Sequence, residues 1–385
     1  MKQLITTFIL YILITCFTIP SVAYAYGGDV EVQSLLTQTL NFSKQPIRID
    51  GVVAMPDEAI AVIYYTAGTK PGTEEYRFDF FSADGHPILS KSFCQVNPAE
   101  SQVPHAQIIL QRDRFLCEYY PDITSMEVCY RTGYSYSGSV VSKEKKVRLK
   151  YGEAYYAEHV GDYMILKQAH GYDEPDASPY QAVEIIHIST AQRVSLRLYD
   201  WSTFCPFVGR NGDLFIAQKN ENGNLEIRRY DIASDMQESI TEFSAECFHG
   251  KRFAYIQSAT SIGNLAYLQV RLTNEEAAIL TYDMEEGIIT ASSTLRAAPG
   301  SDYIVSVQSN GSVLLAVDGR WNEALQCYVL SIDAIDAGMG RTPVALMHEQ
   351  CLFILRDEVS GTLITIEVDE DTSSFAVCRY KISAL

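Results

Sequence analysis

The chain has 385 residues, of which 47% are hydrophobic, 11% aromatic and 20% charged. That composition is typical of a globular protein and excludes a disordered or fibrous chain. With 30 Lys and Arg against 48 Asp and Glu, the formal net charge is −18. Nucleic acids and anionic membrane surfaces require basic patches, so this acidic balance excludes nucleic acid as a partner.

Residues 1–25 have the pattern of a Sec-type secretory signal peptide. After a positively charged start, residues 4–19 form an almost wholly apolar run that Pro20 ends, and an Ala-Tyr-Ala cleavage pattern finishes at Ala25. The apolar run is shorter than the roughly 20 residues that cross a bilayer, and an uncleaved anchor is the alternative. We expect an exported chain, secreted or held in the cell envelope, whose residues 26–385 form one domain without an integral membrane segment.

Eight cysteines remain after the signal peptide, namely Cys94, Cys117, Cys129, Cys205, Cys247, Cys327, Cys351 and Cys378. None of them forms a C-x-x-C pair or has a histidine at zinc-ligand spacing, so we expect no zinc site. An oxidising compartment permits disulfides, and Cys117 could face Cys129 across a hairpin. The interpretation we favour is that these cysteines are small apolar residues buried on strands.

Almost every segment after the signal peptide has the pattern of a short strand. Apolar and polar residues alternate over five to eight positions between turn residues, and we find no convincing helix. One well-marked stretch predicts four strands, at residues 204–209, 214–219, 225–232 and 236–243. The Asn- and Gly-rich segment 220–224 is the hairpin turn, because these residues tolerate a positive φ.

One element recurs along the chain: a strand ends in an aromatic or bulky residue, and a polar residue and a turn follow. The residues at this position are Phe81, Tyr130, His187, Tyr230, Tyr282, Leu330 and Tyr380, and they are 43 to 57 residues apart. Repeats of about 50 residues with about four strands each are typical of β-propellers. Seven such positions predict an all-β chain forming one seven-bladed propeller. The alternatives are a ring of six or eight blades, or two β-sandwich domains.

The two ends of the domain predict how the ring closes. Tyr380 belongs to a third strand, and the last blade therefore lacks its outermost strand, whereas residues 32–40 have no blade of their own. If residues 32–40 pair with residues 375–382, they supply that strand and remove an exposed sheet edge. Over residues 30–385 the repeat resembles that of secreted bacterial seven-bladed β-propeller proteins. No recurring Trp-Asp dipeptide or kelch glycine pair assigns a subfamily.

Catalytic motifs are absent from the sequence. There is no P-loop, dinucleotide-binding or zinc-protease motif, and the Gly-Tyr-Ser-Tyr-Ser-Gly segment 133–138 has one residue too many for a nucleophile elbow. The seven histidines are scattered, so we expect no metal site. Histidines on innermost strands, such as His159, would nevertheless converge on a propeller's central channel.

Acidic and aromatic residues provide the candidate ligand-binding site. Two polar insertions, 170–178 and 367–371, group carboxylates that could bind Ca²⁺, but neither matches a calcium-binding loop. We favour solvated turns and expect no cofactor. Trp201 follows an outer strand and Trp321 lies in a loop, and in a propeller both loops open on the same face. Aromatic faces beside carboxylates suit sugars or peptides, and the candidate residues are Trp201, Trp321, Asp173, Glu174 and Asp176.

These observations favour a binding module over an enzyme. We expect a monomer that binds a protein, peptide or glycan through its loop face. The alternative is a carbohydrate-active enzyme, a glycan hydrolase or lyase, that uses a pair of carboxylates at the channel mouth. No residue is assigned a catalytic role. Most tyrosines, including the pairs at 64–65 and 119–120, are expected to pack between blades.

Overall fold

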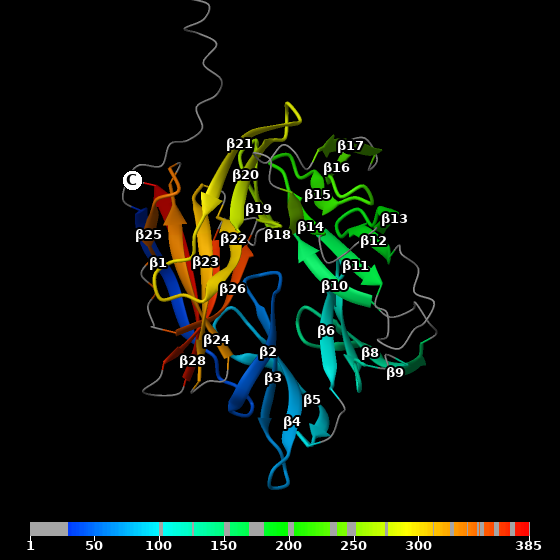
Figure 1. The fold of residues 1–385 in the computed structure, drawn as a ribbon. Helices are drawn as coiled ribbons and strands as arrows, with labels where there is room; N and C mark the ends of the chain where they lie inside the picture. Colours follow the sequence, from blue (N-terminus) through cyan, green and yellow to red (C-terminus); the bar gives the residue numbers. More distant parts are fainter. Residues whose placement is uncertain are drawn as a thin grey trace, which may run out of the picture.

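The structure is a computed structural model that describes residues 30–99, 103–124, 127–149, 155–168, 181–198, 204–231, 237–244, 252–273, 276–310, 312–323, 327–336, 338–344, 346, 350–357, 362–369 and 374–384. Within these residues the chain forms 28 β-strands and no helix (Figure 1). No helix in this described part is long and apolar enough to cross a membrane. The all-β class predicted from the sequence is therefore confirmed.

The first five sheets each consist of four consecutive antiparallel strands. We number them sheets 1 to 5 in chain order. Sheet 1 contains β2 (Pro46–Ala54), β3 (Ile60–Ala67), β4 (Glu74–Phe81) and β5 (Pro87–Val96). Sheet 2 contains β6 (His105–Leu110), β7 (Arg114–Tyr120), β8 (Val128–Ser135) and β9 (Val140–Arg148). Sheet 3 contains β10 (Tyr155–Val160), β11 (Tyr163–Gln168), β12 (Gln181–His187) and β13 (Arg193–Leu198).

Sheets 4 and 5 repeat this order. Sheet 4 contains β14 (Cys205–Val208), β15 (Leu214–Lys219), β16 (Leu225–Asp231) and β17 (Gln237–Phe243). Its strands agree within one residue at each end with the four predicted for this stretch. Sheet 5 contains β18 (Phe253–Ile262), β19 (Leu265–Leu272), β20 (Ala277–Asp283) and β21 (Ile288–Leu295).

The remaining eight strands form one sheet with two halves, which we call 6a and 6b. Half 6a contains β22 (Tyr303–Ser309), β23 (Leu314–Asn322), β24 (Cys327–Ile335) and β25 (Arg341–Pro343). Half 6b contains β26 (Gln350–Asp357), β27 (Thr362–Asp369), β28 (Ser374–Ala384) and β1 (Val30–Thr39). The halves are joined by the single residue pair Leu330–Cys351 between β24 and β26.

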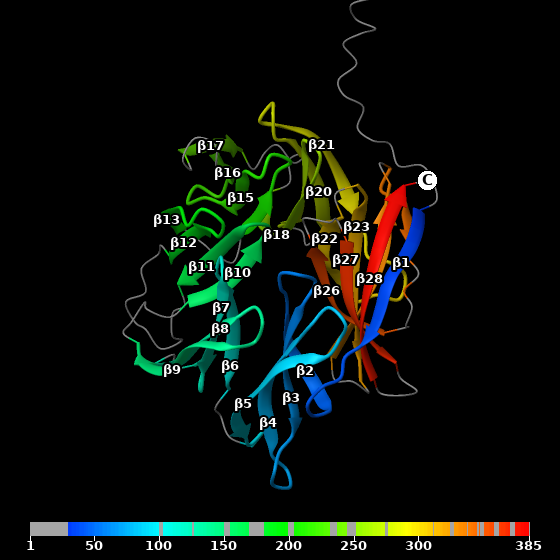
Figure 2. The same cartoon turned by 180° about the vertical axis from the view of Figure 1, so that it is seen from behind.

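The repeat read from the sequence corresponds to equivalent strands. Each of the seven recurring residues lies on the third strand of its sheet or half, namely β4, β8, β12, β16, β20, β24 and β28. The repeat length is therefore that of one four-stranded sheet with its connections, which is the blade architecture of a β-propeller. β1 pairs antiparallel with β28, with Val30 opposite Ala384 and Thr39 opposite Ala376, as the sequence predicted (Figure 2).

Hydrophobic clusters join each sheet to the next. Phe80 of sheet 1 packs with Phe115 of sheet 2, and comparable clusters follow from sheet to sheet as far as 6b. A further cluster joins sheet 1 to 6b and contains Tyr64, Phe81 and Phe375. Phe42, in the connection between β1 and β2, packs edge-on against these three rings with centroids 4.9–5.6 Å apart. Burial of each large apolar side chain stabilises the fold by about 1.5–3 kcal/mol.

Several carboxylates are buried inside the sheets, where they accept hydrogen bonds from neighbouring side chains. Glu118 on β7 is inaccessible to solvent and accepts hydrogen bonds from Gln107 Nε2 (2.9 Å), the Tyr120 hydroxyl (3.0 Å) and Arg131 Nε (2.5 Å). Asp79 accepts from the Tyr64 hydroxyl at 2.9 Å in the same manner. Part of the chain's acidity thus stabilises the interior rather than the surface.

Glu118→Leu tests this role. The substitution leaves the Arg131 guanidinium and three neutral donors, the third being the Tyr155 hydroxyl at 3.3 Å, without their acceptor. The free energy of unfolding measured in urea should therefore fall by about 3 kcal/mol. The control is Glu144→Ala, which removes an exposed carboxylate paired with Lys91 and should change stability by less than about 1 kcal/mol. Equal losses for the two variants would show that Glu118 is no more important than a surface charge.

Candidate functional site

The structure describes one of the five predicted ligand-binding residues. The other four lie outside the described residues, namely Trp201, Asp173, Glu174 and Asp176. That these residues lie together with Trp321 on the loop face of the propeller therefore stays a prediction. Trp321 is the next-to-last residue of β23 rather than a loop residue. The difference arises because β23 and β24 stay paired as far as their ends, which makes this hairpin longer than the sequence indicated.

Trp321 belongs to a group of three rings at the hairpin end of half 6a, which we call the aromatic corner (Tyr303, Trp321 and Tyr328). Trp321 and Tyr328 lie directly opposite each other on β23 and β24, with ring centroids 5.2 Å apart in an edge-to-face arrangement. Tyr303 of β22 packs against Tyr328 at 5.3 Å. Trp321 is 40% exposed and Tyr328 42% exposed. The corner therefore presents aromatic surface to solvent in a fixed arrangement.

Two neighbouring residues hold the aromatic corner in place. Gly319 makes room for the rings, because a Cβ there would lie 3.5 Å from Tyr328 Cδ1, 3.6 Å from Tyr303 Cε1 and only 2.9 Å from a methyl carbon of Val305. Asp302 Oδ2 accepts a hydrogen bond from the Trp321 backbone N–H at 2.8 Å. Partial burial, with Tyr328 and Asp302 nearby, raises the pKa of Tyr303. Its hydroxyl thus stays a hydrogen-bond donor at neutral pH.

Sequence reasoning found Trp321 but missed its partners. Trp321 and Tyr328 flank the β23–β24 turn almost symmetrically, and this spacing is the signal that could have identified Tyr328 as a cross-strand partner. Tyr303 and Asp302 come from the preceding strand and its connection, and their approach depends on strand register. A sequence does not display that register directly.

A separate cavity of about 520 Å³ lies where the first strands of the sheets meet. Its lining comes from β2, β10, β14, β18, β22 and β26, which are the first strands of their sheets or halves. In Figures 1 and 2 these strands surround the middle of the molecule. The polar side chains in the lining are those of Glu158, His159, Thr260, Ser261 and Gln308.

The described lining of this central cavity does not contain the carboxylate pair that a glycosidase requires. Among its residues Glu158 is the one carboxylate, and it forms an ion pair with the Lys167 ammonium. The Thr260 hydroxyl donates to Ser309 Oγ at 3.1 Å, and the Ser261 hydroxyl donates to the Val208 carbonyl at 2.6 Å. A glycosidase places two carboxyl groups on either side of the scissile bond. The described lining supplies a single carboxyl group, that of Glu158, and it is already paired with the Lys167 ammonium.

His159 is the titratable group of most interest in the central cavity. Its Nε2 lies 3.4 Å from the Ile108 carbonyl oxygen, and its Nδ1 is buried with no hydrogen-bond partner in the described part of the chain. Burial lowers the pKa of His159 to about 4, so the ring is neutral at pH 7. No group of three or more His, Cys, Asp or Glu side chains that could hold a metal ion lies together among the described residues.

The acidic segment 367–371 is only partly described. Glu367, its first residue, lies on β27, is inaccessible to solvent and accepts hydrogen bonds from the Tyr380 hydroxyl (2.8 Å) and the Thr365 hydroxyl (2.5 Å). Its carboxylate thus supports the sheet rather than a surface cation. Residues 370–373 and the whole of the insertion 170–178 lie outside the described residues.

The cysteines follow the favoured prediction where the structure describes their side chains. Cys94, Cys117, Cys129, Cys205, Cys351 and Cys378 are free, and all but Cys94 are buried. On β8, Thr132 lies opposite Cys117, three positions from Cys129, so the possible Cys117–Cys129 disulfide is absent. Burial raises the pKa of Cys117 to about 12 and that of Cys129 to about 11, which keeps both thiols protonated and unreactive.

No protein-family model matches the chain, and no curated protein matches its sequence. Among solved structures, a prolyl endopeptidase matches 88% of this chain and 51% of its own at 10% identity, with a TM-score of 0.49. An acylaminoacyl peptidase of Pyrococcus horikoshii matches 83% of this chain and 49% of its own at 9% identity, with a TM-score of 0.46. A chain of a mitotic checkpoint complex matches 95% of this chain and 98% of its own at 11% identity, with a TM-score of 0.46.

The chain thus spans about half the length of these two peptidase chains. At these identities and TM-scores, none of the three structures assigns a residue or an activity to it.

The buried imidazole of His159 predicts a pH dependence of stability. Its folded-state pKa of about 4 lies below the ordinary value of 6.5, so between these values the unfolded chain binds more protons. The free energy of unfolding should therefore fall as the pH is lowered from about 6.5 to about 4, by at most about 3.5 kcal/mol at about 1.4 kcal/mol per pKa unit. Urea titrations at pH 7 and pH 4.5 should show a smaller fall for His159→Gln than for the parent chain, whereas equal falls would contradict the assignment.

Proposed function

We propose that this chain is an exported, seven-bladed β-propeller that binds neutral glycans at the aromatic corner. The seven blades are sheets 1 to 5 and the halves 6a and 6b, with β1 as the outermost strand of the last blade. The cluster that joins sheet 1 to 6b supports ring closure, because each four-stranded unit then has a packed neighbour on both sides. Export is inferred from the signal-peptide pattern of residues 1–25.

The observation that carries the binding proposal is the exposed pair of Trp321 and Tyr328 beside the Asp302 carboxylate. The apolar face of a sugar ring stacks on an exposed indole, while its hydroxyl groups donate to a carboxylate and exchange hydrogen bonds with tyrosine hydroxyls. A neutral, hydroxyl-rich ligand also avoids repulsion by a chain of net charge −18. These features favour a glycan over an acidic peptide as the occupant of the corner.

Trp321→Ala tests the proposal. Loss of one stacking ring costs about 1.5 kcal/mol, so the affinity for bound oligosaccharides should fall about tenfold. The matched control is Tyr255→Ala, which removes a ring on β18 that is equally exposed, at 43%, and should leave the affinity unchanged. The measurement is calorimetric titration against a panel of neutral oligosaccharides.

Fluorescence gives a second measurement of the same event. The chain has two tryptophans, so a Trp201→Phe background makes Trp321 the single reporter, and bound sugar should change its emission. The proposal fails if no oligosaccharide binds, if binding is equal in Trp321→Ala and the parent chain, or if only peptides change the Trp321 emission. The last result would reassign the aromatic corner to peptide recognition.

A further inference from the structure

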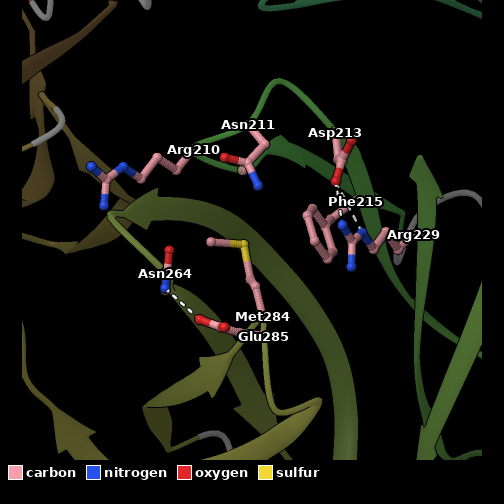
Figure 3. A pocket seen from close by; sticks show the side chains of 9 residues that line it. Arg210, Asn211, Asp213, Phe215, Arg229, Asn264, Met284 and Glu285 are labelled. Carbon is pink, nitrogen blue, oxygen red and sulfur yellow. Dashed lines mark hydrogen bonds and ion pairs between the residues drawn. The ribbon is translucent and has the colours of Figure 1, made fainter. Parts of the chain in front are cut away.

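A pocket of about 520 Å³ opens at the seam between sheets 4 and 5, separate from both the aromatic corner and the central cavity. The β14–β15 turn, β15 and β16 form one side, and the β18–β19 and β20–β21 turns form the other. Its lining consists of Gly209, Arg210, Asn211, Asp213, Phe215, Arg229, Asn264, Met284 and Glu285 (Figure 3). We call it the arginine pocket.

Arg229 is a cation held in a fixed orientation at one side of the pocket. Its Nε and Nη2 donate to the same oxygen of Asp213, Oδ2, at 3.0 and 2.6 Å. Asp213 is buried at 5% exposure, and the guanidinium carbon of Arg229 lies 5.8 Å from the centre of the Phe215 ring. None of the described residues accepts a hydrogen bond from Nη1 of Arg229. The guanidinium is thus oriented in advance, with donors left for a ligand.

Arg210 provides a second cation at the other side of the pocket. It is exposed, in the turn before Asp213, and forms no ion pair with any residue in the described ranges. In Figure 3 its side chain extends toward the β18–β19 turn that carries Asn264 and away from Arg229. The two nearby carboxylates are already engaged, since Asp213 binds Arg229 and Glu285 Oε2 accepts from Asn264 Nδ2 at 2.9 Å.

The floor of the arginine pocket consists of two apolar side chains that are almost wholly buried, Phe215 at 3% exposure and Met284 at 8%. Phe215 and Met284 both belong to the hydrophobic cluster between sheets 4 and 5. Gly209 packs closely against this floor, because a Cβ there would lie 2.8 Å from Phe215 Cε2 and 3.4 Å from Met284 Sδ. The Arg229 guanidinium beside a small apolar surface fits a ligand that has a charged head and a small apolar body.

We propose that the arginine pocket binds an organic carboxylate, with the carboxylate at the Nη1 edge of Arg229, its apolar part against the small exposed surface of Phe215 and Met284, and the exposed Arg210 side chain turning in from its loop to contact it. A planar carboxylate matches the donor geometry of a guanidinium. A single negative charge is accepted despite the net charge of −18, since distant charges are screened beyond about 8 Å at physiological ionic strength. A polyphosphate would instead add several charges close to Asp213 and Glu285.

The same carboxylate chemistry has two sources: a free small acid, or the carboxylate of a peptide. The probes are therefore phenylacetate, its neutral counterpart 2-phenylethanol, inorganic phosphate, and a peptide ending in phenylalanine with a free or an amidated C-terminus. Dissociation constants are measured by calorimetry on the full chain. We expect phenylacetate to bind at least tenfold more tightly than 2-phenylethanol or phosphate, because the charged head loses its partners in the alcohol. Tighter binding of the free-acid peptide than of phenylacetate identifies a peptide source, and the reverse identifies a small acid.

Arg210→Ala is the main variant, because the exposed turn residue is removed without leaving a buried charge unpaired. It should weaken phenylacetate binding at least tenfold. Arg197→Ala, which removes an exposed arginine on β13, is the matched control and should have no effect. Gly209→Ala, which places a methyl group against the floor, should also weaken binding.

The proposal is overturned if 2-phenylethanol binds as well as phenylacetate, or if Arg210→Ala and Arg197→Ala behave alike. Because the arginine pocket and the aromatic corner lie on different sheets, loss of oligosaccharide binding in Trp321→Ala leaves phenylacetate binding intact. The two proposals therefore fail independently.

Discussion

The packing of sheet 1 against half 6b is the contact on which the rest of the structure depends. Phe42 lies between Tyr64 and Phe81 of the first sheet and Phe375 of β28, and β1 lies along β28 just before it. Without this contact, sheet 1 and half 6b would each expose an apolar face, at a cost of about 1.5–3 kcal/mol for each large side chain uncovered. β1 also covers the edge of β28, which would otherwise be open to pairing with other chains.

The proposed ring explains where both proposed sites lie. Its strands are fixed by neighbours on each side, so the residues free to meet ligands are those at strand ends and turns. The aromatic corner lies at a hairpin end and the arginine pocket at a group of turns. In each, an aspartate fixes the key group: Asp302 binds the Trp321 backbone, and Asp213 binds the Arg229 guanidinium. Preorganised groups of this kind lose little conformational entropy on binding.

The sequence predicts the fold better than the sites. Phe81 and Tyr380 could be aligned because a bulky residue before a turn marks the same strand in every sheet, and this signal lies within a few neighbouring residues. The Asp213–Arg229 pair could not be predicted, because it joins the start of one strand to the end of the next and depends on register. Trp321 was found by its residue type, but its place on β23 depends on how far a hairpin stays paired.

The most direct test of the closed ring is a covalent link between its first and last described strands. Thr37 lies opposite Cys378 in the β1–β28 register, and its side chain is hydrogen-bonded to that thiol. Residues opposite each other on antiparallel strands have a Cα separation suited to a disulfide. Thr37→Cys should therefore form a bond to Cys378 on mild oxidation, identified by peptide mass spectrometry, whereas Thr39→Cys, which faces Ala376, should not. If the thiol introduced by Thr37→Cys stays free, or links to another cysteine, the closed ring is contradicted.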